Sequence, residues 1–183
     1  MRKYSIKAID GRIIAAGEAQ SARGLLAHLV KAGEDLSGAD LREWDLSGLD
    51  LDNALMSGAD LTGADMRGTL VRNSDLSGAK LAKVKAHGAR MERAHLDDAD
   101  LSHGHFTGAR MAASKLRRAR LVEADLTDVS APFADFTDAL IDKSALRGGN
   151  FRNADFSRAL LVEDDLSGAD FSDSVFTTME PGA

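Results

Sequence analysis

One apolar position recurs at every fifth residue along most of the chain. From Leu36 to Phe176, 29 successive positions spaced by five hold Leu, Met, Val, Ile, Phe or Ala, without one insertion or deletion. Two residues before each of them, Ala, Gly, Ser or Thr stands at 23 of the 29 sites. A period of five matches neither an α-helix, which repeats about every 3.6 residues, nor a continuous strand, which alternates. It fits a short extended segment followed by a turn, with the large and the small residue inside and the residue between them outside.

The glycines indicate how many of these quintets complete one coil. Six of seven positions spaced by twenty residues are glycine, with Asp128 as the exception, whereas the neighbouring series that begins at Asn53 has none. Glycine and asparagine tolerate left-handed turns, so each series should be one kind of corner. A recurrence of twenty predicts four sides per coil, and 29 quintets then give about seven coils. The six glycines are Gly48, Gly68, Gly88, Gly108, Gly148 and Gly168.

Individual quintets carry a family motif. Ala39-Asp40-Leu41, Ala59-Asp60-Leu61 and Ala154-Asp155-Phe156 resemble the A(D/N)LXX consensus of the pentapeptide repeat family. The resemblance implies an all-β solenoid over residues 34–178, a right-handed quadrilateral parallel β-helix, and its handedness rests on the resemblance alone. Residues 179–183 remain as a C-terminal tail.

Residues 1–33 lack the repeat and should cap the first coil. Tyr4 to Ile9 and Arg12 to Ala16 flank Asp10-Gly11, which predicts a β-hairpin with a tight primed turn. Ser21 is typical of a helix N-cap, and apolar residues follow at helical spacing. A solenoid needs such a cap because an open end exposes apolar side chains and unpaired strand edges. The helical residues are Leu25, Leu26, Leu29 and Val30.

The opposite end of the predicted solenoid carries phenylalanines. Phe136, Phe156 and Phe176 are spaced by twenty and should form a stacked ladder. Phe156, Phe171 and Phe176 belong to the final coils, where uncovered apolar side chains favour association. The resemblance to dimeric members of the family implies a homodimer formed through this C-terminal end.

Composition excludes several classes of protein. The chain has no cysteine, which excludes disulfides, thiolate nucleophiles and cysteine-based zinc sites. Its formal net charge of -6 argues against direct binding of nucleic acid. No apolar run approaches the roughly 18 residues of a membrane span, and the N-terminal residues lead into no signal core. We therefore expect a cytoplasmic protein without membrane contact.

No motif points to catalysis or to a cofactor. The sequence contains no nucleophile elbow, Walker loop, H-E-x-x-H or dinucleotide signature. Parallel β-helix enzymes carry long loop insertions, and these quintets carry none. His103 and His105 stand two residues apart, with His87 one coil earlier, but no further ligand is placed to complete a metal site. The sequence predicts no enzyme and no catalytic, cofactor-binding or metal-binding residue.

Charge is distributed unevenly along the chain. Residues 80–120, the basic girdle, hold ten Lys or Arg and four Asp or Glu, a net charge of +6, while the remainder carries −12. The girdle is either a site for an anion or a partner, or a means of balancing charge between coils. Asp60, Lys80, Asp100 and Arg120 would stack with alternating sign, which favours charge balancing.

Four apolar residues should point outward on one face of the later coils. Exposed apolar side chains that cluster mark interaction sites, and burial beneath the chain's own tail is the alternative. The sequence therefore predicts, first, a non-catalytic scaffold that binds a protein partner. The four residues are Val122, Leu140, Leu160 and Val162.

The family resemblance implies a second possible function. Some pentapeptide repeat proteins are acidic rods that resemble DNA, bind DNA gyrase or topoisomerase, and protect it from quinolone-type inhibitors. Such mimicry requires ordered carboxylates along a rod of DNA width. The basic girdle departs from that pattern, and the loops that gyrase-binding members often carry are absent. The candidate carboxylates are Asp40, Asp45, Asp50, Asp60, Asp65, Asp135, Asp155, Asp165 and Asp170.

Overall fold

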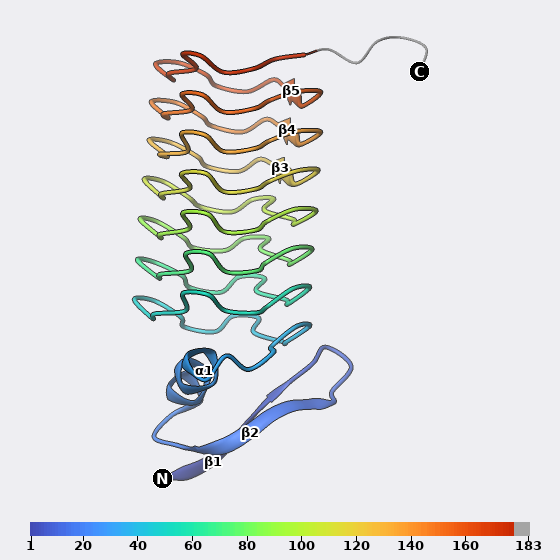
Figure 1. The fold of residues 1–183 in the computed structure, drawn as a ribbon, viewed down its shortest axis with the longest axis vertical. Coiled ribbons are helices and arrows are strands. Elements are labelled where there is room, and N and C mark those ends of the chain that lie inside the picture. The colour runs from blue at the N-terminus through green and yellow to red at the C-terminus, as the bar shows by residue number, and fades with distance from the viewer. Residues whose placement is uncertain (178–183) are drawn as a thin grey trace.

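The computed structural model describes residues 1–177, and from Asp35 onward they form a stack of coils above a hairpin and a helix (Figure 1). Neighbouring coils pair in parallel at a step of twenty residues, from the bridge between Asp35 and Leu55 to that between Asp155 and Val175. On one side the bridges lengthen into a parallel three-stranded sheet in the order β3-β4-β5. Its strands are β3 (Arg120–Val122), β4 (Leu140–Asp142) and β5 (Leu160–Val162).

Each quintet ends in a left-handed corner. Every fifth residue from Gly38 to Asp173 has a φ between 53° and 70°, whether or not it is glycine. A hydrogen bond such as that from Ala39 N–H to the Leu36 carbonyl, 3.1 Å, closes the turn around the corner. A positive φ at the third residue of such a turn is typical of type II. The sequence-based expectation of left-handed corners is confirmed, and pairing at twenty residues places four of them in each coil.

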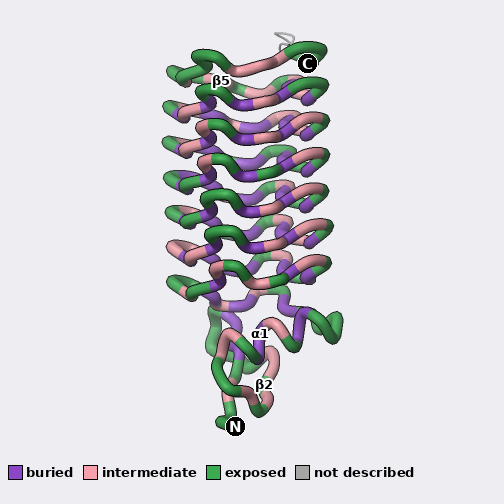
Figure 2. The backbone as a smooth tube through the Cα atoms, turned by 90° about the vertical axis from the view of Figure 1, so that its left-hand side faces the viewer, coloured by how far each residue is buried: buried purple, intermediate pink, exposed green. Residues whose placement is uncertain are grey.

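The core is a narrow column of one large and one small residue per quintet. Both positions are buried from Leu51 to Phe156, whereas Trp44 and Leu49 in the first coil are half-buried and the last coil is half-buried or exposed (Figure 2). Where the small residue is Ser or Thr, its hydroxyl donates to a backbone carbonyl. Thr69 donates to Leu46 at 2.8 Å and Ser74 to Leu51 at 2.9 Å, both in the preceding coil, whereas Ser114 donates to Met111 of its own turn at 2.7 Å. The small site therefore admits a hydroxyl without leaving it unpaired.

Phenylalanine side chains form two ladders inside the last coils. The rings of Phe136 and Phe156 stack at 4.7 Å between centroids, and those of Phe156 and Phe176 at 5.1 Å, as the spacing of twenty predicts. Phe151 and Phe171 form a second stack at 5.1 Å, which meets the first edge to face. Both geometries are favourable for aromatic rings.

The N-terminal segment begins with an antiparallel hairpin of β1 (Arg2–Lys7) and β2 (Ile13–Ala19). The expected primed turn is wrong, since a type I′ turn needs positive φ at both central residues and only Gly11, at 84°, has it. Gly11 N–H donates to the Ala8 carbonyl, and the Asp10 carboxylate accepts from Arg12 N–H. The turn is therefore a type I turn followed by a left-handed glycine.

Helix α1 (Ala22–Lys31) follows the hairpin and packs on the first coil. The Ser21 hydroxyl accepts from Gly24 N–H at 3.0 Å, so Ser21 is the N-cap expected from sequence. The apolar face of α1, with Leu26 fully buried, belongs to the same core as Leu36. The hairpin joins the first coil through a hydrogen bond of 2.7 Å from Asp40 N–H to the Lys7 carbonyl.

Candidate protein-interaction surfaces

The four outward apolar residues predicted from sequence lie together on the sheet of β3, β4 and β5, and we call them the strand face (Val122, Leu140, Leu160 and Val162). Leu140 pairs directly with Leu160 in the parallel register. Leu160 is 52% exposed and Val162 42%. Asp142, which the sequence-based prediction did not include, separates Val122 from Val162, and Arg120 precedes Leu140. A spacing of twenty residues was the signal that could have identified both.

The last described coil exposes a second apolar surface. Phe176 is 54% exposed, and Val175 and Leu166 are 48% and 40% exposed. Phe171 is half-buried against the core. Phe156 does not belong to this surface, contrary to the prediction, because Phe176 stacks on it and leaves it 1% exposed. The predicted tail, residues 179–183, lies outside the described residues.

The aspartates that directly precede the large inward residue of a quintet stabilise the turns. The carboxylate of each one accepts the backbone N–H two residues further on, as in Asp155 with Ser157 at 2.8 Å. The serine hydroxyl and N–H two residues on lower the pKa of Asp45, Asp165 and Asp170. This is the Asx-turn geometry, in which a short acidic side chain replaces a backbone acceptor. The same contact is present at Asp35, Asp40, Asp45, Asp50, Asp60, Asp65, Asp75, Asp135, Asp165 and Asp170.

The nine candidate DNA-mimic carboxylates do not form one continuous surface. Along each column of bridged residues, a run of aspartates spans at most two coils among the described residues: Asp40 and Asp60 are followed by Lys80, and Asp50 by Leu70. Several are also neutralised locally, such as Asp65 by Arg67 at 2.5 Å. The acidic positions are therefore short clusters separated by basic or apolar residues.

The basic girdle is partly neutralised by carboxylates. Lys80 lies 3.8 Å from Asp60, and Arg90 and Arg110 both contact Glu92, at 3.3 and 3.2 Å. Arg117 and Arg118 pair with Asp135 and Asp98. These pairs support charge balancing between coils, although exposed pairs contribute little stability individually. Within residues 1–177, no ion pair holds the remaining cations of the girdle, which are Lys83, Lys85, Arg93, Lys115 and Arg120.

The histidines do not assemble a metal centre. His87 and His105 stack with their centroids 5.8 Å apart, while His103 Nδ1 lies 3.3 Å from a carboxylate oxygen of Glu123. Over the described part of the chain, no group of three or more potential ligands could hold a metal ion.

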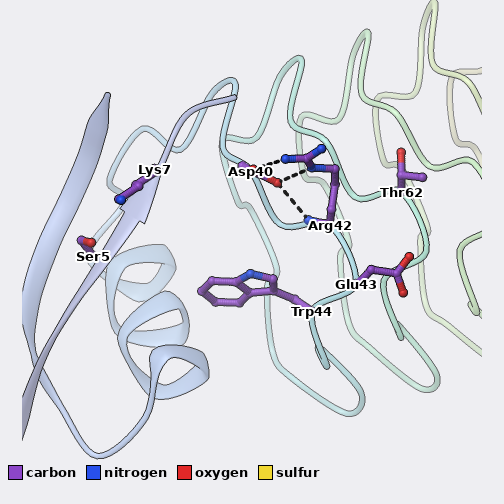
Figure 3. A pocket seen from close by; sticks show the side chains of 7 residues that line it. All are labelled: Ser5, Lys7, Asp40, Arg42, Glu43, Trp44 and Thr62. Carbon is purple, nitrogen blue, oxygen red and sulfur yellow. Dashed lines mark hydrogen bonds and ion pairs between the residues drawn. The ribbon is translucent and has the colours of Figure 1, made fainter. Parts of the chain in front are cut away.

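A hollow of about 550 Å³ lies between β1 and the first coils (Figure 3). Its residues come from the hairpin (Ser5, Lys7) and from the coils, and the ring of Trp44 points toward the hairpin and α1. Arg42 is held by both oxygens of Asp40, at 2.7 and 2.6 Å, so its charge is already paired. No sequence motif marks this hollow, because it arises from the docking of the hairpin.

Asp164 departs from the repeat because it occupies the position of a small inward residue. One of its oxygens accepts from Ser144 N–H at 2.6 Å, and the other is buried without a partner. Burial raises the pKa of Asp164, and the nearby Asp142 adds to the effect. One coil earlier, the Ser144 hydroxyl accepts from Ala124 N–H in the same way at 3.0 Å.

We therefore expect Asp164→Ser to stabilise the protein at pH 7, because serine keeps the acceptor and removes the charge. A carboxyl whose pKa is raised on folding destabilises the fold only when ionised, so the gain should shrink as the pH falls toward 4. Urea unfolding at both pH values measures it. The exposed neighbour Asp165, whose pKa is lowered, provides the control: Asp165→Ala should lose stability at pH 7. A gain for Asp164→Ser that is equal at both pH values would contradict the assignment.

A model of pentapeptide repeats (8 copies) matches residues 35–73, 74–111, 105–142 and 142–177. The chain belongs to the pentapeptide repeat family. Membership, together with the parallel pairing at twenty residues, makes residues 35–177 a right-handed β-helix solenoid.

Solved structures of other pentapeptide repeat proteins resemble this one. A protein from the thylakoid lumen of Arabidopsis thaliana is 27% identical, covers 62% of this chain and 75% of its own, and has a TM-score of 0.54. HetL, involved in heterocyst differentiation regulation in Nostoc sp. strain PCC 7120, is 27% identical over 78% of this chain and 80% of its own, with a TM-score of 0.37.

A third similar structure is a trypsin-treated variant of QnrB1, a plasmid-mediated fluoroquinolone resistance protein. It is 15% identical over 78% of this chain and 89% of its own, with a TM-score of 0.52, and this likeness shows the fold alone. No curated protein matches the sequence significantly. Within residues 1–177, no helix of this pentapeptide repeat protein combines the length and the apolar character needed to cross a bilayer.

Proposed function

We propose that this pentapeptide repeat protein is a non-catalytic scaffold whose strand face binds a protein partner. The solenoid of about seven coils, closed at its N-terminal end by the hairpin and α1, would serve as a rigid support for that face. The observation that carries the proposal is the direct stacking of Leu140 on Leu160, beside Val162, on an exposed sheet. A contiguous apolar cluster on the outside of a soluble repeat is typical of a binding surface.

The double variant Leu140→Asp/Leu160→Asp tests the proposal. Both side chains point outward, so the solenoid should stay folded while partner capture from lysate of the native cell falls at least about tenfold, as expected for loss of a hot spot. Quantitative mass spectrometry of the captured proteins is the measurement, and circular dichroism checks the fold.

Leu55→Asp is the matched control, because Leu55 is an isolated outward leucine, 45% exposed, in an early coil. It should capture the same proteins as the unmodified chain. If the double variant captures them as well, the strand face is not the binding surface.

We further propose a homodimer through the last described coil. The exposed side chains of Phe176, Val175 and Leu166 support it, since their burial against a second copy would remove apolar surface from water. Light scattering of a dilute sample should give twice the mass of the chain. A strict monomer would refute the dimer and leave the strand face unaffected.

The alternative function, mimicry of DNA toward gyrase, is less well supported. The net charge of −12 outside the girdle favours it. The interrupted aspartate columns and the ion pairs at Asp40 and Asp65 weigh against it. A gyrase supercoiling assay with a quinolone, with and without the protein, decides: the scaffold proposal expects no change, and protection of supercoiling would favour the mimic.

A further inference from the structure

Phe133 occupies a left-handed corner that is asparagine in three other coils. The residues at this corner in successive coils are spaced by twenty. They are Asn53, Asn73, Arg93, Ala113, Phe133, Asn153 and Asp173. All have φ between 55° and 61°, and Phe133 has 60°. Asparagine is several-fold enriched in this conformation, whereas a bulky residue there is an outlier. The chain therefore accepts backbone strain at Phe133 that asparagine would reduce.

The ring of Phe133 also faces water. Phe133 is 64% exposed, more than any other large apolar residue between Leu36 and Phe176. The phenylalanines of the inner repeat positions in the neighbouring coils, Phe106, Phe136 and Phe151, are at most 1% exposed. The backbone strain and the exposed ring of Phe133 are each unfavourable for the isolated molecule. Strained residues are often found at functional sites. Phe133 is therefore a candidate anchor for a binding partner.

The surroundings of Phe133 combine an apolar strip with a basic border. Pro132 precedes Phe133, and Ala113 occupies the same corner one coil earlier. The Ala113 N–H donates a hydrogen bond of 2.9 Å to the Pro132 carbonyl. Arg93 is at the same corner one coil before Ala113, and Lys115 lies on the adjoining side. Neither cation has an ion pair among the described residues.

We propose that Phe133 anchors a second protein partner, one that presents an apolar pocket bordered by carboxylates. An exposed aromatic side chain is typical of an interface hot spot, and the unpaired Arg93, two coils earlier, and Lys115, on the adjoining side, complement an acidic border. Nucleic acid fits less well, because Glu92 holds Arg90 and Arg110 and Asp135 holds Arg117, which leaves fewer free cations near this corner than a phosphate backbone would engage. One whole side of the coil, residues 134–138, separates this corner from the strand face. The two proposed binding surfaces are therefore independent of each other.

Selection of a random peptide display library on the immobilised full chain tests the proposal. We expect selected peptides that combine Leu, Phe or Trp with Asp or Glu, and that bind Phe133→Asn at least about tenfold more weakly, the loss typical of a hot spot. Phe133→Asn should remain folded, with a melting temperature no lower than that of the unmodified chain, because asparagine occupies this corner in three other coils.

Two controls keep the outcome specific to this position. Phe133→Asn/Asn73→Phe moves the ring to the same corner of another coil and should not restore binding. Leu140→Asp/Leu160→Asp should leave the selected peptides bound. Peptides that bind Phe133→Asn normally, or no Phe133-dependent peptide at all, would overturn the proposal. Two other results would also overturn the proposal. One is binding of a (dT)20 oligonucleotide that is lost in Phe133→Asn, and the other is self-association, measured by sedimentation, that is lost in Phe133→Asn.

Discussion

Adding a single methyl group at Gly104 or Gly149 should destabilise the solenoid by about 1–3 kcal/mol, the usual cost of overpacking a core. A Cβ at Gly104 would lie 2.4 Å from Cε2 of Phe106 and 2.9 Å from the Leu101 carbonyl oxygen. At Gly149 the corresponding distances, to Phe151 and to the Leu146 carbonyl, are 2.5 and 3.0 Å. Neither glycine has a positive φ, so the penalty is steric and does not come from backbone strain.

The midpoint of urea unfolding measures the loss for Gly104→Ala and Gly149→Ala. Gly104→Ala/Phe106→Leu should recover most of the stability, because leucine beside alanine is a common pair in the other quintets. Unchanged midpoints in the single variants would show that the rings do not occupy the space described. An equal loss of stability in Gly104→Ala and in Gly104→Ala/Phe106→Leu would show that the clash with the Phe106 ring is not the cause.

Aspartate at position 141 should unfold part of the solenoid, while aspartate at the neighbouring position 140 should be tolerated. Ile141 is fully buried, and its register partners Leu121 and Leu161 leave an ionised side chain no compensating group. Burying an unpaired charge is among the few mechanisms that cost more than about 4 kcal/mol. Leu140 points outward next to Arg120 in the preceding strand, so its replacement should cost about 1 kcal/mol or less.

Far-ultraviolet circular dichroism and thermal unfolding compare the two single variants, Ile141→Asp and Leu140→Asp. The two residues are adjacent isomers and both become aspartate, so the two variants have the same mass and the same net charge. Equal stability of the two variants would contradict the assignment of inside and outside along β4.

Much of this architecture follows from the spacing of residues. The step of twenty that the glycine series predicts is the step at which Asp60 pairs with Lys80 and Phe136 stacks on Phe156. A strict period without insertions fixes the register, because every coil must place its large residue over the one before it. The strand face could be predicted for the same reason.

The roles of individual polar residues were harder to predict. The sequence predicts a charged surface from the outward aspartates, whereas their first contact is the N–H two residues on, a local hydrogen bond that periodicity does not reveal. The sequence places Phe156 at the exposed end, although Phe176, in the next coil, covers it. The hollow beside Trp44 could not be predicted because it depends on how the hairpin docks.

The pairing of residues twenty apart underlies every surface described, and disulfide formation tests it most directly. The chain has no cysteine, so a pair introduced at His95 and Lys115, which are bridged, reports on that contact alone. Neighbouring strands lie about 4.8 Å apart, within the span of a disulfide. Mild oxidation should link His95→Cys with Lys115→Cys, but not with Arg110→Cys or Arg120→Cys. A link to either of these, with none at position 115, would contradict the four-sided coil.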